Sequence, residues 1–219
     1  MNSEHYPFEL LPLAYSYNAL EPYIDAETVM LHHDRHLKTY VDNLNIALRD
    51  YPQYHKWSLQ RLLKNIKQLP RNIQTPVHNN AGGVYNHNLY FRIMQSPIRN
   101  SLDTEKLKNS HIYKAINKTF GSFDAFKNTL KESGVARFGS GYAWLVCNKN
   151  DGLKILSTAN QDTPFSTGFA PILLVDVWEH SYYLKYHNLR LNYLDNWFNL
   201  INWDEVENNF IECVLRKNH

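Results

Sequence analysis

The spacing of apolar residues changes once along this chain, and that change limits the folds it can adopt. Through Leu130, apolar residues recur every three or four positions, which is typical of amphipathic helices. Short apolar runs follow at 142–146, 153–158 and 172–175, and runs of this length are typical of strands. The pattern predicts an α+β fold, with an N-terminal helical hairpin domain and a C-terminal α/β domain that contains a small three-stranded antiparallel sheet.

Prolines divide the helical half of the chain. Asp25 is a suitable N-cap for a long helix that we expect to run to about Arg49, and Pro52 then interrupts the pattern because proline lacks a backbone N–H. A second amphipathic segment, 59–66, is predicted to pair with the first helix as a hairpin. A third helix is expected over 77–94.

The polar stretch after Ser96-Pro97 is the best candidate for a boundary between two domains. We expect an N-terminal helical hairpin domain over residues 1–97 and a C-terminal α/β domain over residues 98–219. Inside the second domain, residues 148–152 are predicted to form the turn that joins the first two strands.

Charge and cysteine content argue against several classes of function. Lys plus Arg total 23 against 21 Asp plus Glu, so the net charge of +2 gives no basis for binding nucleic acid or a membrane surface. Cys147 and Cys213 provide neither a paired zinc motif nor a disulfide framework, which fits a reducing compartment. Residues 1–7 lack a basic segment followed by an apolar run. We therefore predict a cytoplasmic protein, with a leader removed during maturation as the alternative.

Several histidines and one aspartate are candidate metal ligands. Asp176 and His180 lie four residues apart where the third apolar run leads into a helical segment, so both can reach one ion, although capping or chance explains most such pairs. His32, His36 and Tyr40 recur every four residues on one helix face. Three polar rings in a row are costly to bury without a shared partner.

His87 adds a single imidazole among apolar and aromatic neighbours on the third helix. By itself it is more typical of a buried, hydrogen-bonded histidine. Together the candidates offer three neutral nitrogens and one carboxylate, which suit manganese or iron with one position open for solvent. A structural zinc site is more usually closed by cysteines, and an iron oxygenase with two histidines and one carboxylate needs no third imidazole.

Five motifs occur in an order that resembles the iron/manganese superoxide dismutase family. The likeness extends from the N-terminal prolines to Trp203 and depends on the segments Leu31–Val41, Asn79–His87, Phe138–Gly141, Thr158–Asp162 and Asp176–Tyr183. The resemblance implies a superoxide dismutase, which disproportionates superoxide to hydrogen peroxide and oxygen with one redox-cycling manganese or iron ion per subunit. It also implies that the ligands are His32 and His87 from the first domain and Asp176 and His180 from the second.

The resemblance implies roles for residues around the metal. His36 and Tyr40 are expected to line the substrate funnel. Gln161 is expected to hydrogen-bond the metal-bound solvent, and Trp178 to form a wall of the pocket.

The resemblance implies two further residues at the edge of the site. Glu179 is expected to reach His180 of the partner subunit and Tyr183 to approach His36 of the partner subunit, which implies a homodimer, with a homotetramer as the alternative. Arg190 or Arg35 is expected to supply positive potential for the anionic substrate.

Gly83 and Gln161 bear on the choice of metal. The iron members of the family usually carry a glutamine where this chain has Gly83, whereas a glutamine on the hairpin strand, like Gln161, resembles the manganese members. We therefore predict manganese, with iron, or activity with both metals, as alternatives. Four positions depart from the family pattern, which puts the packing of the pocket in question: Leu37, Phe91, Tyr142 and Leu191.

Two other functions are compatible with such a ligand set. A protein that binds manganese or iron without turnover would need none of the residues outside the ligands. A different mononuclear iron oxidoreductase would be revealed by binding of an organic cosubstrate.

Overall fold

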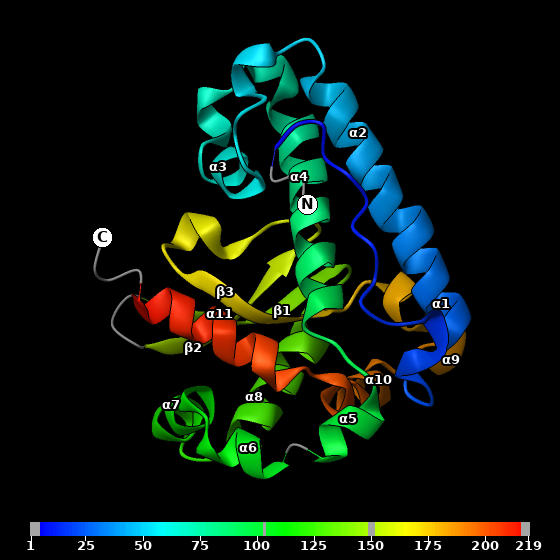
Figure 1. Ribbon diagram of the computed structural model, residues 1–219, viewed down its shortest axis with the longest axis vertical. Helices are drawn as coiled ribbons and strands as arrows, with labels where there is room; N and C mark the ends of the chain where they lie inside the picture. Colours follow the sequence, from blue (N-terminus) through cyan, green and yellow to red (C-terminus); the bar gives the residue numbers. More distant parts are fainter. Residues whose placement is uncertain (1–4, 103, 149–151, 216–219) are drawn as a thin grey trace.

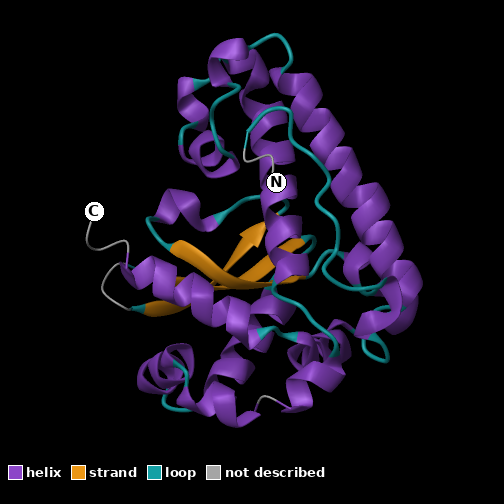
Figure 2. Ribbon diagram, viewed as in Figure 1, coloured by secondary structure: helices purple, strands orange, loops and turns teal. Residues whose placement is uncertain are grey.

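The computed structural model describes residues 5–102, 104–148 and 152–215, in which helices enclose a small sheet (Figures 1 and 2). The strands are β1 (Gly141–Cys147), β2 (Leu153–Ala159) and β3 (Ala170–Asp176). The helices are α1 (Ala26–Leu31), η2 (His32–Leu37), α2 (Lys38–Leu48), α3 (Leu59–Lys64), α4 (Arg71–Arg92), α5 (Pro97–Leu102), α6 (Thr104–Asn109), α7 (His111–Phe120), α8 (Phe123–Ala136), η6 (Glu179–Ser181), α9 (Tyr183–Tyr186), α10 (Arg190–Trp197) and α11 (Trp203–Leu215). Short 3₁₀ turns join several of them.

The predicted first helix is one rod made of α1, η2 and α2 (Figure 1). Asp25 caps it, because its carboxylate accepts a hydrogen bond from the backbone N–H of Thr28 at 2.8 Å. In its middle, η2 is a π-helix. Its hydrogen bonds run from residue i to i+5, a rare form that is frequent at functional sites. The apolar spacing predicted the rod but not this π-helical turn, which carries His32 and His36.

The second arm of the helical hairpin is α4, not the predicted segment around α3. Figure 1 shows α2 and α4 side by side, and the short α3 also packs against α4. Helix α4 begins at Arg71, well before the predicted residue 77, with Pro76 inside it. The helix accommodates Pro76 in its second turn, although a proline removes one backbone hydrogen bond there.

The sheet has three antiparallel strands, as predicted, and their order is β2-β1-β3. The central strand β1 is buried along its whole length, with α8 packed against β1 and β2, and α4 and α11 packed against β3. Of the predicted turn at 148–152, residues 149–151 lie outside the described residues, as do residues 1–4 of the N-terminal segment.

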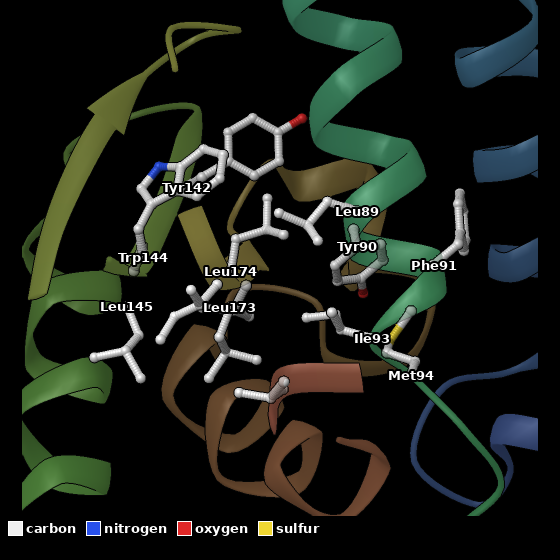
Figure 3. Packing of buried hydrophobic residues seen from close by; sticks show 14 of the residues in the cluster. Leu89, Tyr90, Phe91, Ile93, Met94, Tyr142, Trp144, Leu145, Leu173 and Leu174 are labelled. Carbon is white, nitrogen blue, oxygen red and sulfur yellow. The ribbon is translucent and has the colours of Figure 1, made fainter. Parts of the chain in front are cut away.

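The two halves of the chain share one core. Figure 3 shows Leu89 and Tyr90 of α4 facing Tyr142 and Leu174 of the sheet, and all four side chains are buried. Just after α4, backbone hydrogen bonds of 2.7 Å join Gln95 N to Leu200 O and Asn202 N to Ile93 O. Within the described part of the chain, no helix combines the length and the apolar character needed to cross a bilayer.

Candidate metal centre

Four candidate ligands converge between the two halves of the chain. His32 comes from η2, His87 from α4, Asp176 from the last position of β3 and His180 from η6. One side-chain N or O atom from each residue lies within 4.8 Å of the corresponding atoms of the other three. The sequence-predicted ligand residues therefore meet in space, although they come from four separate elements.

The four converging atoms lack hydrogen-bond partners. His32 Nε2, His87 Nε2, Asp176 Oδ2 and His180 Nε2 are all buried without one. Leaving a buried polar atom unsatisfied costs about 1–3 kcal/mol. Four such atoms aimed at one point satisfy the requirements of a metal ion, which accepts lone pairs from all of them together. The residues present therefore fit the metal that the sequence predicts.

Hydrogen bonds elsewhere on these side chains fix their orientation. His87 Nδ1 lies 2.7 Å from the carbonyl oxygen of Gly83, so Nδ1 carries the proton and Nε2 is left as the ligand atom. Asp176 Oδ1 accepts from the backbone N–H of Trp178 at 2.8 Å, which leaves Oδ2 for the metal. The backbone carbonyl of Asp176 accepts from the Tyr193 hydroxyl at 2.9 Å.

The surroundings keep His32 and His87 neutral and Asp176 ionised near neutral pH. Burial lowers the pKa of His32 to about 4, and the neighbouring His180 contributes. Burial also holds the pKa of His87 well below its ordinary value. Burial alone would raise the pKa of Asp176, but the His180 and His32 imidazoles beside its carboxylate outweigh this and lower it. Neutral imidazoles and an ionised carboxylate are the forms that bind metals.

Gln161 lies beside the ligands in a fixed orientation. Its Oε1 accepts hydrogen bonds from the Tyr142 hydroxyl at 2.9 Å and from Asn86 Nδ2 at 3.2 Å. Its Nε2 donates to the Tyr40 hydroxyl at 3.1 Å. Tyr142 stands at one of the positions that depart from the family pattern, and its hydroxyl holds the Gln161 amide. Asn86 lies within the matched segment Asn79–His87 but was given no role from the sequence, and the structure shows it buried beside His87.

Two adjacent glycines of α4 make room for this network. A Cβ atom at Gly83 would overlap the ring of Tyr40, and one at Gly82 would overlap the backbone carbonyl of Gln161. The resemblance described above places a glutamine at the position of Gly83 in the iron members of the family. In this chain the phenol ring of Tyr40 occupies the space beside Gly83.

We expect Gly83→Ala to reduce turnover roughly tenfold or more, because the methyl group displaces the Tyr40 ring and misplacements near 1 Å can cost up to about 100-fold. Metal content should stay unchanged, since the ligands keep their positions. Superoxide removal per bound metal measures the effect. Gly134→Ala is the matched control, because a methyl group in helix α8 meets only the ends of the Leu194 and Val177 side chains. Equal losses in both variants would contradict this role for Gly83.

Aromatic rings surround His180 and His87 where the centre approaches the surface. The exposed His36 stacks on His180, with ring centroids 4.3 Å apart, and Trp178 stacks on His180 at 5.5 Å. Tyr40 lies 5.2 Å from His87, and burial raises the pKa of its hydroxyl. His36 and Tyr40, which were predicted to line the funnel, and Trp178, which was predicted to form a wall of the pocket, therefore contact the candidate ligands.

The other predicted residues lie farther out. Glu179 and Tyr183 are exposed. The guanidinium of Arg190 donates to the carbonyls of Arg137 and Gly139 at 2.6 and 3.1 Å. These bonds give Arg190 a structural role in holding the chain between α8 and β1. Arg35 is exposed on the π-helical turn.

Three other positions depart from the family pattern. Phe91 lies 5.0 Å from His32, with the rings edge to face, so it packs directly against a candidate ligand. Leu37 is buried and Leu191 is exposed.

Two family models match this chain. Residues 7–95 match the model described as iron/manganese superoxide dismutases, alpha-hairpin domain, and residues 108–209 match the model for the C-terminal domain of the same family.

Curated relatives match nearly the whole chain. A manganese superoxide dismutase of Leptolyngbya boryana, numbered 3, is 47% identical and covers 93% of this chain and 83% of its own length. Manganese superoxide dismutase 2 of Bacillus anthracis is 44% identical, with 97% and 99% covered. The manganese superoxide dismutase of Thermus thermophilus is 47% identical, with 94% and 98% covered.

Proposed function

The chain belongs to the iron/manganese superoxide dismutase family, and from this premise we propose how its own residues disproportionate superoxide to hydrogen peroxide and oxygen. The protein is an oxidoreductase that acts on superoxide. One observation carries the proposal: four buried donor atoms without hydrogen-bond partners lie within 4.8 Å of one another. We propose His32, His87, Asp176 and His180 as the ligands.

These four residues would hold a redox-active ion, which would take the electron that one superoxide gives up and pass it to the next. The residues around it manage protons and access, because forming hydrogen peroxide also requires two protons. The raised pKa of Tyr40 keeps its phenol protonated at neutral pH, and the Gln161 amide donates to the phenol oxygen at 3.1 Å. We propose that this pair holds and delivers protons, while His36 and Trp178 restrict access to small anions.

Manganese is the proposed metal. The names of the relatives specify manganese, and Tyr40 fills the space that Gly83 leaves open, while Gln161 lies against Gly82. Iron, or activity with both metals, remains the alternative that the loading experiment decides.

The experiment strips the metal, reloads separate samples with manganese, iron or zinc, and measures superoxide removal per bound metal. We expect turnover with manganese that exceeds turnover with iron at least tenfold, and none with zinc, because zinc does not change its oxidation state. Equal activity with iron would contradict the manganese assignment. Stoichiometric binding without turnover for both redox metals would instead support a protein that only stores metal.

We propose a homodimer through the surface next to the metal centre. Phe138 is 93% exposed, and Tyr183, Leu189 and Leu191 are each about half exposed. Arg190 donates a hydrogen bond to the carbonyl of Gly139, which links the segment that contains Leu189 and Leu191 to the segment that contains Phe138. An apolar patch of this kind favours a protein partner. The proposal puts Glu179 and Tyr183 at the second subunit's site.

Phe138→Asp is expected to convert the dimer into a monomer, since the charge would be buried in the interface. Sedimentation equilibrium measures the mass. Ile98→Asp, which places the same charge at another exposed apolar residue, should leave the dimer intact. A monomeric starting protein, or a dimer that survives Phe138→Asp, would contradict this interface.

We also propose a cytoplasmic location and the domain limits 1–97 and 98–219. The two cysteines, which are separate thiols, support a reducing compartment. The family models end and begin on either side of the proposed boundary.

A further inference from the structure

The sulfur atoms of two cysteines that lie far apart in the sequence are both close to the same backbone oxygen. Cys147 is the last residue of β1, and Cys213 lies in the final turn of α11, the helix that crosses the sheet in Figure 1. The Cys147 sulfur lies 3.1 Å and the Cys213 sulfur 3.6 Å from the carbonyl oxygen of Asn148. The two sulfur atoms are therefore no farther apart than the sum of these distances, and they are not joined by a disulfide.

A cavity of about 250 Å³ is lined by both cysteine residues. Cys147 is fully buried, whereas Cys213 keeps 6% of its surface exposed, so Cys213 is the thiol that an oxidant meets first. Lys64 and Arg92 line the same cavity with one acidic residue, Glu212. The thiolate is the form of cysteine that reacts with peroxide.

We propose that Cys147 and Cys213 form a peroxide-reactive thiol pair that closes to an intramolecular disulfide. The oxidant is hydrogen peroxide, a product of the proposed function on which this step rests. The Cys213 thiolate attacks one peroxide oxygen, the O–O bond breaks, and hydroxide leaves as Cys213 becomes a sulfenic acid. The Cys147 sulfur then attacks the Cys213 sulfur, the S–O bond breaks and water leaves. In total, two thiols lose two electrons and two protons, and one peroxide becomes two waters.

The disulfide ties the end of the central strand to the C-terminal helix. Cys147 lies at the opposite end of β1 from Tyr142, about 16 Å along the strand, so closure leaves the metal centre in place. The closed loop includes β2, β3 and the ligands Asp176 and His180. Cross-linking a loop of this size restricts the unfolded chain. The oxidised form should therefore resist unfolding more strongly at unchanged turnover.

The test treats the full-length, metal-loaded protein with added hydrogen peroxide, so that it does not depend on the protein's own turnover. We expect the mass to fall by about 2 Da, the titratable thiols to fall from two to none, and a peptide cross-linked between Cys147 and Cys213 to appear after digestion. The melting temperature should rise by roughly 5 °C or more. A dithiol reductant should reverse every change.

Single-thiol variants separate the two steps. Cys147→Ser should stop at a Cys213 sulfenic acid that dimedone traps, while Cys213→Ser should react much more slowly because its remaining thiol is buried. If a variant fails to fold, the cross-linked peptide from the unaltered chain still shows whether the disulfide between Cys147 and Cys213 forms. Two thiols that stay titratable, irreversible sulfinic acids, or disulfides between chains would each overturn the proposal. Loss of dismutase activity with a normal disulfide would count against the proposed function alone.

Discussion

Asp176→Asn is expected to leave a folded chain that holds little metal and removes superoxide more than roughly 100-fold more slowly. This loss exceeds the one expected when a residue that only supports a metal ligand is removed. Asp176 is the only anionic member of the proposed ligand set. The replacement keeps the shape of the side chain and an oxygen that can accept from the Trp178 backbone N–H. Its NH₂ group, however, points a donor where the metal needs a lone pair.

The measurement combines metal content by elemental analysis with superoxide removal and circular dichroism. Asp195→Asn makes the same chemical change at an exposed position paired with Lys131, and it should bind metal normally. Full metal content and turnover in Asp176→Asn would refute the assignment of this carboxylate. A variant that fails to fold is identified by its spectrum, and Asp176→Glu then tests the same charge with a displaced oxygen.

Gln161→Glu is expected to lower turnover roughly 10- to 100-fold while metal content stays near that of the unaltered protein. The change removes the amide donor that contacts the Tyr40 hydroxyl and places a carboxylate at a side chain that is only 4% exposed. A second negative charge near Asp176 stabilises the more positive oxidation state of the ion. The midpoint potential should therefore shift to lower values.

Gln53→Glu is the matched control, since it makes the same amide-to-acid change at an exposed residue. Redox titration and activity per bound metal are measured on both variants. If Gln161→Glu shows neither a shifted potential nor slower turnover, the amide does not tune the centre.

Local spacing was sufficient to predict parts of this site. Asp176 and His180, and likewise His32 and His36, are four residues apart, so the sequence indicated that each pair lies close together, although Asp176 ends β3 and the histidine pair lies on a π-helix. The meeting of these pairs with His87 depends on how a helical hairpin packs against a sheet, which apolar periodicity does not encode. The family motifs supplied that part of the prediction.

Hydrogen bonds that depend on strand register were not predictable. Tyr142 pairs with Thr158 across β1 and β2, just before Gln161, and its hydroxyl donates to the Gln161 amide oxygen. The sequence marked Tyr142 only as a departure from the family pattern. Likewise, the pairing of α2 with α4 was missed, because the hairpin was predicted from the order of the amphipathic segments along the chain and the third helix was expected to start only at residue 77.

Because the ligands come from four separate elements, the metal site forms late in the synthesis and folding of the chain. His32 and His87 leave the ribosome early, but the ligand set stays incomplete until β3 and η6 have been synthesised. Contacts between such distant parts of a chain form late in folding. The ion is therefore captured only after β3 and η6 have folded against the helical hairpin.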